Sequence, residues 1–198
     1  MKTLRQVTGR VLAAGLIVLG LGAMKQAYAV NNPDTMTVSV TPSVTYGVSI
    51  SSVNGSGYQF QTVALGATTV STKAITLTNT GNVSEYFSMA ISNTSGSWSA
   101  VTAGAPGQDQ FRLTAELAAN QPVEGSGFKT GTAPGGDSLA NPPVPATASG
   151  LYANGGSQSK TAAAGTSNLW LQLEMPTSLN AGGSGLQTMT LTVNGQGS

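Results

Sequence analysis

The sequence predicts an all-β fold: a single antiparallel β-sandwich, jelly-roll or immunoglobulin-like, with one long loop rich in proline and glycine. Apolar and polar residues alternate with a period of two through most of the chain beyond residue 29, as expected for strands with one buried and one wet face. Valine and threonine, which favour strands, are abundant there. No segment beyond residue 29 has the apolar spacing of an amphipathic helix.

The first 29 residues have the three parts of a secretory signal peptide. A basic start is followed by an uncharged apolar run over residues 11–24, and Ala27 and Ala29 occupy the positions that a signal peptidase reads. The apolar run is shorter than the roughly 20 residues of a membrane-spanning helix. We therefore expect cleavage after Ala29 and export to the periplasm, the cell surface or the extracellular space. An uncleaved N-terminal anchor is the alternative.

The expected mature chain, residues 30–198, is 169 residues long and suits one domain with its own hydrophobic core. It contains no cysteine and no histidine, and its four basic residues stand against seven acidic ones, a formal charge of −3. Without a basic patch, neither nucleic acid nor anionic lipid is an expected partner, and no membrane span is expected after signal removal. So low a charge favours association with other proteins.

The alternation predicts about eight strands, separated by Asn- and Gly-rich turns such as residues 54–57, 79–82 and 180–183. The apolar residues of these runs, in chain order, are Met36, Val38 and Val40; Val44, Tyr46, Val48 and Ile50; Tyr58, Phe60, Val63 and Leu65; Ile75 and Leu77; Phe87, Met89 and Ile91; Phe111, Leu113, Ala115 and Leu117; Leu169, Leu171 and Leu173; Met189, Leu191 and Val193. The slip of one residue in the third run indicates a bulge.

The segment 118–166 interrupts the alternation and holds most of the prolines of the chain. A structureless connection of this length is unusual in a compact domain. We expect a surface excursion at one end of the sandwich, with a short strand at Leu151 and Tyr152. The segment is either a contacting loop or a plain connector.

No catalytic site is expected, because the chain lacks both a histidine base and a cysteine nucleophile. Residues 136–139 spell the motif of the GDSL esterases, but that family has its serine near the mature N-terminus and a histidine far downstream. Asp109 and Glu116 are an odd number of residues apart and so face opposite sides of a regular strand, unlike the paired carboxylates of a glycosidase. With Glu174, they are also too scattered to bind a metal, and no cofactor is expected.

Two tryptophans are the candidate ligand contacts. Trp170 alternates with Leu169 and Leu171, so it is either exposed, as a platform on which a sugar can stack, or part of a strand buried on both faces. Trp98 either contributes to such a platform or closes the end of the core. A soluble extracellular module that binds glycans is therefore the alternative function.

The N-terminal run over residues 35–50 has no lysine or arginine and is interrupted by Pro42 and Gly47 alone. Strand edges without charged residues pair readily with other chains. Met36, Val38 and Val40 therefore belong either to the first strand of the protein's own sandwich or to an assembly strand that inserts into a neighbouring subunit.

Three stretches, residues 63–66 (VALG), 75–82 (ITLTNTGN) and 87–93 (FSMAISN), place a strand, an Asn-Thr-Gly-Asn turn and a second strand after a Leu-Gly pair. Over about thirty residues, this arrangement resembles extracellular β-sandwich modules of the CARDB-like type and of the TasA/camelysin group of biofilm-fibre proteins. The second resemblance implies a jelly roll, a cleaved leader and a role in a matrix fibre.

These observations predict a secreted, non-catalytic structural or surface protein, such as a matrix or filament subunit that associates by strand edges. Its expected partners are copies of itself, another surface protein or a glycan.

Overall fold

The computed structural model describes residues 36–51, 57–129, 138–139, 152–153, 158–180 and 182–197. The chain divides into two units, Met1–Pro42 and Ser43–Ser198, and every described strand belongs to the second. The expected signal peptide with Ala27 and Ala29, and also Leu151, lies outside the described residues.

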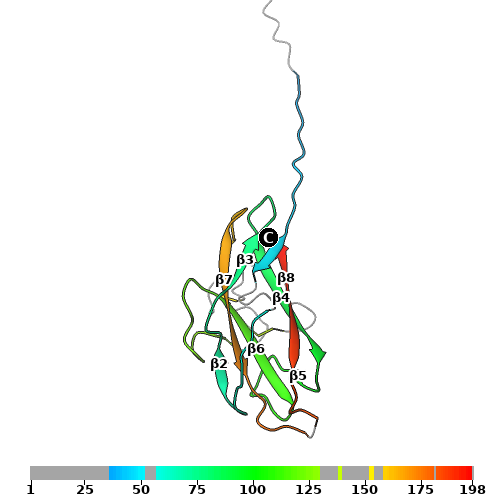
Figure 1. Ribbon diagram of the computed structural model, residues 1–198. Coiled ribbons are helices and arrows are strands. Elements are labelled where there is room, and N and C mark those ends of the chain that lie inside the picture. The colour runs from blue at the N-terminus through cyan, green and yellow to red at the C-terminus, as the bar shows by residue number, and fades with distance from the viewer. Residues whose placement is uncertain are drawn as a thin grey trace, which may run out of the picture. The chain divides into compact units, whose positions relative to one another are not determined.

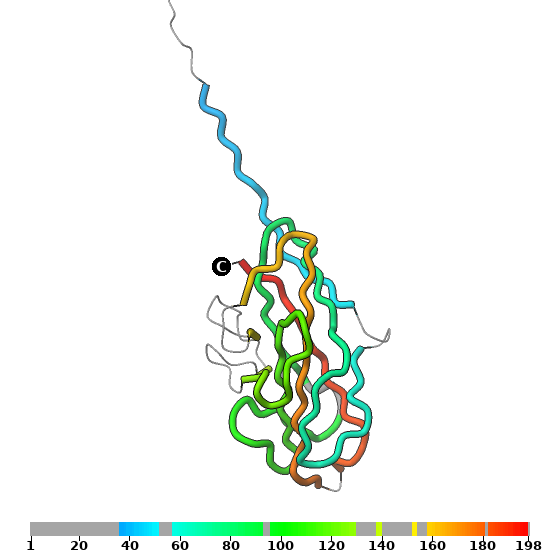
Figure 2. The backbone as a smooth tube through the Cα atoms, turned by 90° about the vertical axis from the view of Figure 1, so that its left-hand side faces the viewer, coloured from blue at the N-terminus to red at the C-terminus, as the bar shows by residue number. Residues whose placement is uncertain are grey.

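The described part of Ser43–Ser198 is all-β, which confirms the predicted fold class: it contains eight strands and no helix. The strands are β1 Val48–Ser51, β2 Thr68–Val70, β3 Ile75–Asn79, β4 Tyr86–Ser95, β5 Ser99–Ala100, β6 Gln110–Leu117, β7 Thr166–Glu174 and β8 Thr188–Gln196. They run back and forth along one common direction (Figure 2).

The strands form two sheets (Figure 1). The six-stranded sheet has the order β1-β3-β7-β6-β5. The sixth strand, β2, pairs with β7 on the same side as β3 but with a later part of β7. The second sheet consists of β4 and β8. The ladders are antiparallel except for the two-residue pairing of β5 with β6, which is parallel and departs from the predicted purely antiparallel arrangement.

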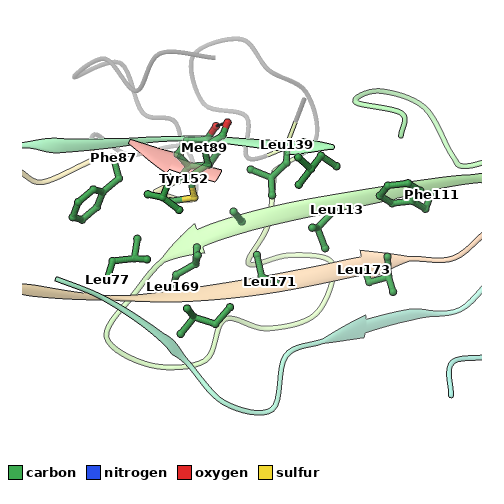
Figure 3. Close-up of a cluster of buried hydrophobic side chains, with 14 of the residues drawn as sticks. Leu77, Phe87, Met89, Phe111, Leu113, Leu139, Tyr152, Leu169, Leu171 and Leu173 are labelled. Atoms are coloured by element: carbon green, nitrogen blue, oxygen red, sulfur yellow. Dashed lines mark hydrogen bonds between the residues drawn. The ribbon is translucent and has the colours of Figure 1, made fainter. Parts of the chain in front are cut away.

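The hydrophobic core draws on both sheets. Figure 3 shows side chains of β4 on one side of this cluster and side chains of β6 and β7 on the other. The alternation of β3, β4, β6, β7 and β8 supplies rows of apolar residues to the cluster. Its buried members are Ile75, Leu77, Phe87, Met89, Ile91, Trp98, Phe111, Leu113, Ala115, Leu139, Tyr152, Leu169, Leu171, Leu173 and Val193.

β7 is buried on both faces rather than half-buried. Leu171 faces the core, while the segment 118–129 covers the other face, where Trp170 and Gln172 lie. The side-chain oxygen of Gln172 accepts a hydrogen bond from the backbone N–H of Gly125 at 2.7 Å. Part of the long loop therefore forms a third layer over this strand.

Leu139 and Tyr152, two described residues of the long loop, also close part of the edge of β6. The N–H of Leu139 donates to the carbonyl of Leu113 at 2.9 Å, and the N–H of Leu117 donates to the carbonyl of Tyr152 at 2.8 Å. Tyr152 is fully buried in a turn with a left-handed φ of 58° instead of the expected short strand. The described residues of the loop are thus structural.

Within Ser43–Ser198, two predicted strands are absent or shorter. The run that contains Tyr58, Phe60 and Val63 forms no strand, because Gln61 adopts a left-handed φ of 60° in its middle. The rings of Tyr58 and Phe60 instead pack edge to face, with centroids 4.9 Å apart, against the core. The run before it becomes a strand only from Val48 onward.

Candidate assembly surface

The N-terminal segment, which we define as residues 36–42, pairs with no strand in the described chain. Its apolar side chains are exposed to water: 85% of Met36, 71% of Val38 and 82% of Val40. Burying a side chain of this size contributes roughly 1.5–3 kcal/mol. These residues form no strand in the described chain, and their apolar side chains gain none of this burial energy there.

The chain that follows this segment is held firmly to the turn between β3 and β4. The carbonyls of Gly47 and Thr45 accept hydrogen bonds from the N–H groups of Thr80 and Asn82, at 2.8 and 3.1 Å. The side chain of Asn82 accepts from the N–H of Thr45 at 2.9 Å and donates to the carbonyl of Ser43 at 2.8 Å. These bonds continue the contact between β1 and β3 beyond the ends of both strands, and they reach as far as Ser43.

A buried carboxylate fixes the same stretch from the inside. Glu85 is fully buried, and its Oε2 accepts a hydrogen bond from the N–H of Gly47 at 3.0 Å. The other oxygen, Oε1, is buried without a hydrogen-bond partner among the described residues. Gly195 of β8 makes room for the carboxylate, since a Cβ there would lie 2.3 Å from Oε2. Sequence reasoning missed both Asn82 and Glu85, because neither stands out in the local pattern.

One edge of the two-stranded sheet is closed by side chains. Gln158 acts on β4 as a neighbouring strand would: its Oε1 accepts from the N–H of Phe87 at 2.7 Å, and its Nε2 donates to the carbonyl of the same residue at 3.2 Å. Further along β4, the hydroxyl of Tyr152 donates to the carbonyl of Met89 at 3.2 Å. The edge of β4 is therefore unavailable to a further strand.

The other edge of this sheet is open among the described residues: β8 pairs with β4 along one side, and no described strand pairs with its second side. Beyond the end of β8, Tyr46 lies against Gly197. Along β8, Met189 and Leu191 are partly buried against the core, whereas the intervening Thr190 and Thr192 are exposed. β8 carries no charged residue. Figure 1 shows β8 as the red strand beside β4.

The two tryptophans offer no platform for a sugar. Each is only 9% exposed, and each indole N–H donates to a backbone carbonyl at 3.0 Å, Trp98 to Gly183 and Trp170 to Ala118. Trp170 therefore takes the second of the two options left by the sequence, a strand buried on both faces. Trp98 packs beside Phe111 in the core, with ring centroids 6.3 Å apart.

The acidic residues singled out in the sequence have separate surroundings. Glu174 forms an ion pair with Arg112, and Asp109 accepts a hydrogen bond from the N–H of Asn180 at 3.0 Å. Glu116 borders an open hollow of about 520 Å³. In the part of the chain that the structure describes, no group of three or more acidic, histidine or cysteine residues is placed to hold a metal ion.

No protein-family model matches this chain, and no curated protein is significantly similar to it. Within the described residues there is no helix with the length and apolar character needed to cross a membrane. The function must therefore be inferred from the chemistry of the exposed segment and of the open strand edges.

Proposed function

We propose that this protein is a secreted, non-catalytic structural protein that associates with copies of itself through strand edges, as a subunit of a filament or matrix outside the cell. The observation that carries the proposal is the N-terminal segment, whose three large apolar side chains are each more than 70% exposed. A segment that alternates like a strand, pairs with no described strand and carries no charge is suited to pair with another chain.

Self-association is favoured because some strands of the described chain also have an edge with which no other described strand pairs. An exposed strand edge presents a row of N–H and C=O groups that can bind a further strand. A segment that binds a different surface on the next copy makes a heterologous contact, which leads to open filaments when the rotation between copies does not close a ring. This geometry supports a filament or matrix subunit rather than a closed dimer.

Charge does not oppose this contact. Neither residues 36–51 nor β8 contains a lysine, arginine, aspartate or glutamate, the residues with which many proteins protect their strand edges. The formal charge of −3 expected for residues 30–198 gives only weak repulsion between copies. Export, which the signal-like leader supports, would place such a self-associating chain outside the cytoplasm.

The proposal is tested by comparing residues 30–198 with a variant that combines Met36→Thr, Val38→Thr and Val40→Thr. We expect concentration-dependent oligomers or filaments of the first protein in analytical ultracentrifugation and negative-stain microscopy, and a monomer with the same circular dichroism spectrum for the variant. A matched control, Thr37→Ser with Thr41→Ser, alters the polar face of the segment and should still assemble. A wild-type chain that stays monomeric, or a triple variant that assembles equally well, contradicts the proposal.

A further inference from the structure

We infer that the N-terminal segment of one copy binds the open edge of β8 in a second copy, as a third strand of the two-stranded sheet. This inference rests on the proposed self-association and names the surface that receives the segment. It follows from which edges of the described sheets are free, from their lengths, and from the pattern of side chains on each face.

Length selects β8 among the free edges. The edge of β6 is covered by β5, Leu139 and Tyr152, and the edge of β4 is occupied by Gln158 and Tyr152. β1 has only four residues, whereas β8 has nine. The run from residue 36 to 41 needs an acceptor of at least its own length for a full ladder, and Pro42, which has no N–H, is suited to the end of that ladder.

The side-chain patterns of donor and acceptor match. On β8, Met189, Leu191 and Val193 lie against the core, and the threonines between them are exposed. A strand added beside β8 in register would place Met36, Val38 and Val40 next to this apolar row and the residues between them next to the threonines. A register shifted by one residue would expose the apolar row, so the paired arrangement is specified by burial.

The two-stranded sheet also gains stability from a third strand. An isolated two-stranded sheet is only marginally stable in water, and a further strand with an apolar face is one way to stabilise it. Val193 is buried, with 8% of its surface exposed, whereas Met189 and Leu191 are only partly buried. Apolar side chains from the added strand would cover Met189 and Leu191. Donor and acceptor remain different surfaces, so each added copy presents a new free edge.

Engineered cysteines test this contact cleanly, because the chain has none of its own. Residues 30–198 with Ser39→Cys are mixed under mild oxidation with a size-tagged Thr190→Cys, Thr192→Cys or Asn194→Cys variant of the same residues. These three positions lie on the exposed face of β8 and cover the neighbouring registers. Two controls report other edges: Ser49→Cys on β1, and Ser159→Cys beside the closed edge of β4. Cross-strand neighbours bring the two Cβ atoms close enough for a disulfide.

We expect at least one β8 variant to give about tenfold more disulfide-linked heterodimer than either control, since pairing raises the effective concentration of the two thiols. An assembled protein that cross-links Ser39→Cys equally well to β1 or to position 159, or to none of the three β8 positions, overturns this inference and leaves self-association standing. A protein that remains monomeric throughout overturns both.

Discussion

The ion pair between Arg112 and Glu174 joins two residues that face each other directly across the β6–β7 ladder. The Nε of Arg112 donates to Oε1 of Glu174 at 2.8 Å, and the Nη2 of Arg112 donates to Oε2 of Glu174. The two side chains are 9% and 16% exposed. Removing one partner of a bidentate ion pair that is shielded from water lowers the stability strongly, because the charge of the other partner then remains buried without a counter-charge.

Replacing Glu174 by Gln should therefore lower the free energy of unfolding by about 3 kcal/mol, measured by urea denaturation. The double variant Arg112→Leu with Glu174→Leu removes both charges and should be less destabilised than Glu174→Gln. A loss below about 1 kcal/mol for Glu174→Gln would show that water reaches the guanidinium and that the pair behaves like a surface contact.

Gly195 is required for space rather than for backbone conformation. A Cβ at this position would meet the buried carboxylate of Glu85 at 2.3 Å from Oε2. We expect Gly195→Ala to lower the free energy of unfolding by about 1–3 kcal/mol, as overpacking does. In a double-mutant cycle, Glu85→Ala should relieve part of that cost, so the two effects should be non-additive. Additive losses in thermal or chemical unfolding would mean that the strain at Gly195 has another source.

At the scale of the strand, the edge of β4 depends on one amide side chain. Gln158 satisfies both backbone groups of Phe87, which would otherwise be buried without partners. We expect Gln158→Met to lower the free energy of unfolding by about 1–3 kcal/mol for each buried group left unpaired. Hydrogen exchange of the Phe87 amide should also accelerate relative to its neighbours on β4. Unchanged protection of that amide would contradict the role given to Gln158.

The sequence predicts those strands that have one face in the core. β3, β4, β6, β7 and β8 all appear as apolar alternation, because each contributes a row of side chains to the same cluster. The second buried face of β7 could not be predicted, since it depends on where residues 118–129 fold. The run around Phe60 alternates equally well, yet Gln61 turns the backbone out of the strand region.

The contacts that hold residues 43–47 likewise could not be predicted from the sequence. Asn82 and Glu85 bind Thr45 and Gly47 across separations of 37 and 38 residues, and no local pattern encodes such a pairing. The sequence does show that the exposed segment alternates apolar and polar residues and lacks lysine and arginine. Its alternation cannot distinguish a strand of the protein's own sheet from a strand meant for another copy, because the same side chains serve both.

At the scale of the whole molecule, the protein carries few charges, and its N-terminal segment holds three exposed large apolar side chains close together in the sequence. Introducing a charge there, with Val38→Lys, should weaken self-association by roughly tenfold or more, because pairing would bury an ammonium group. Val123→Lys is a matched control, since Val123 is also 71% exposed but lies in the loop over β7. Sedimentation velocity over a dilution series measures both. Equal effects of the two lysines would point to general charge repulsion instead of strand pairing.

The central claim, that residues 36–41 find their strand partner only in another copy, is tested most directly by their amide hydrogen exchange as a function of protein concentration. We expect the amides of residues 36–41 to exchange as in an unstructured peptide in dilute monomer. One alternating set, either Met36, Val38 and Val40 or Thr37, Ser39 and Thr41, should become protected as the protein assembles, because alternate N–H groups point to the same edge of a strand. Protection that is already complete in the monomer, or that never develops in the assembled protein, would contradict the account.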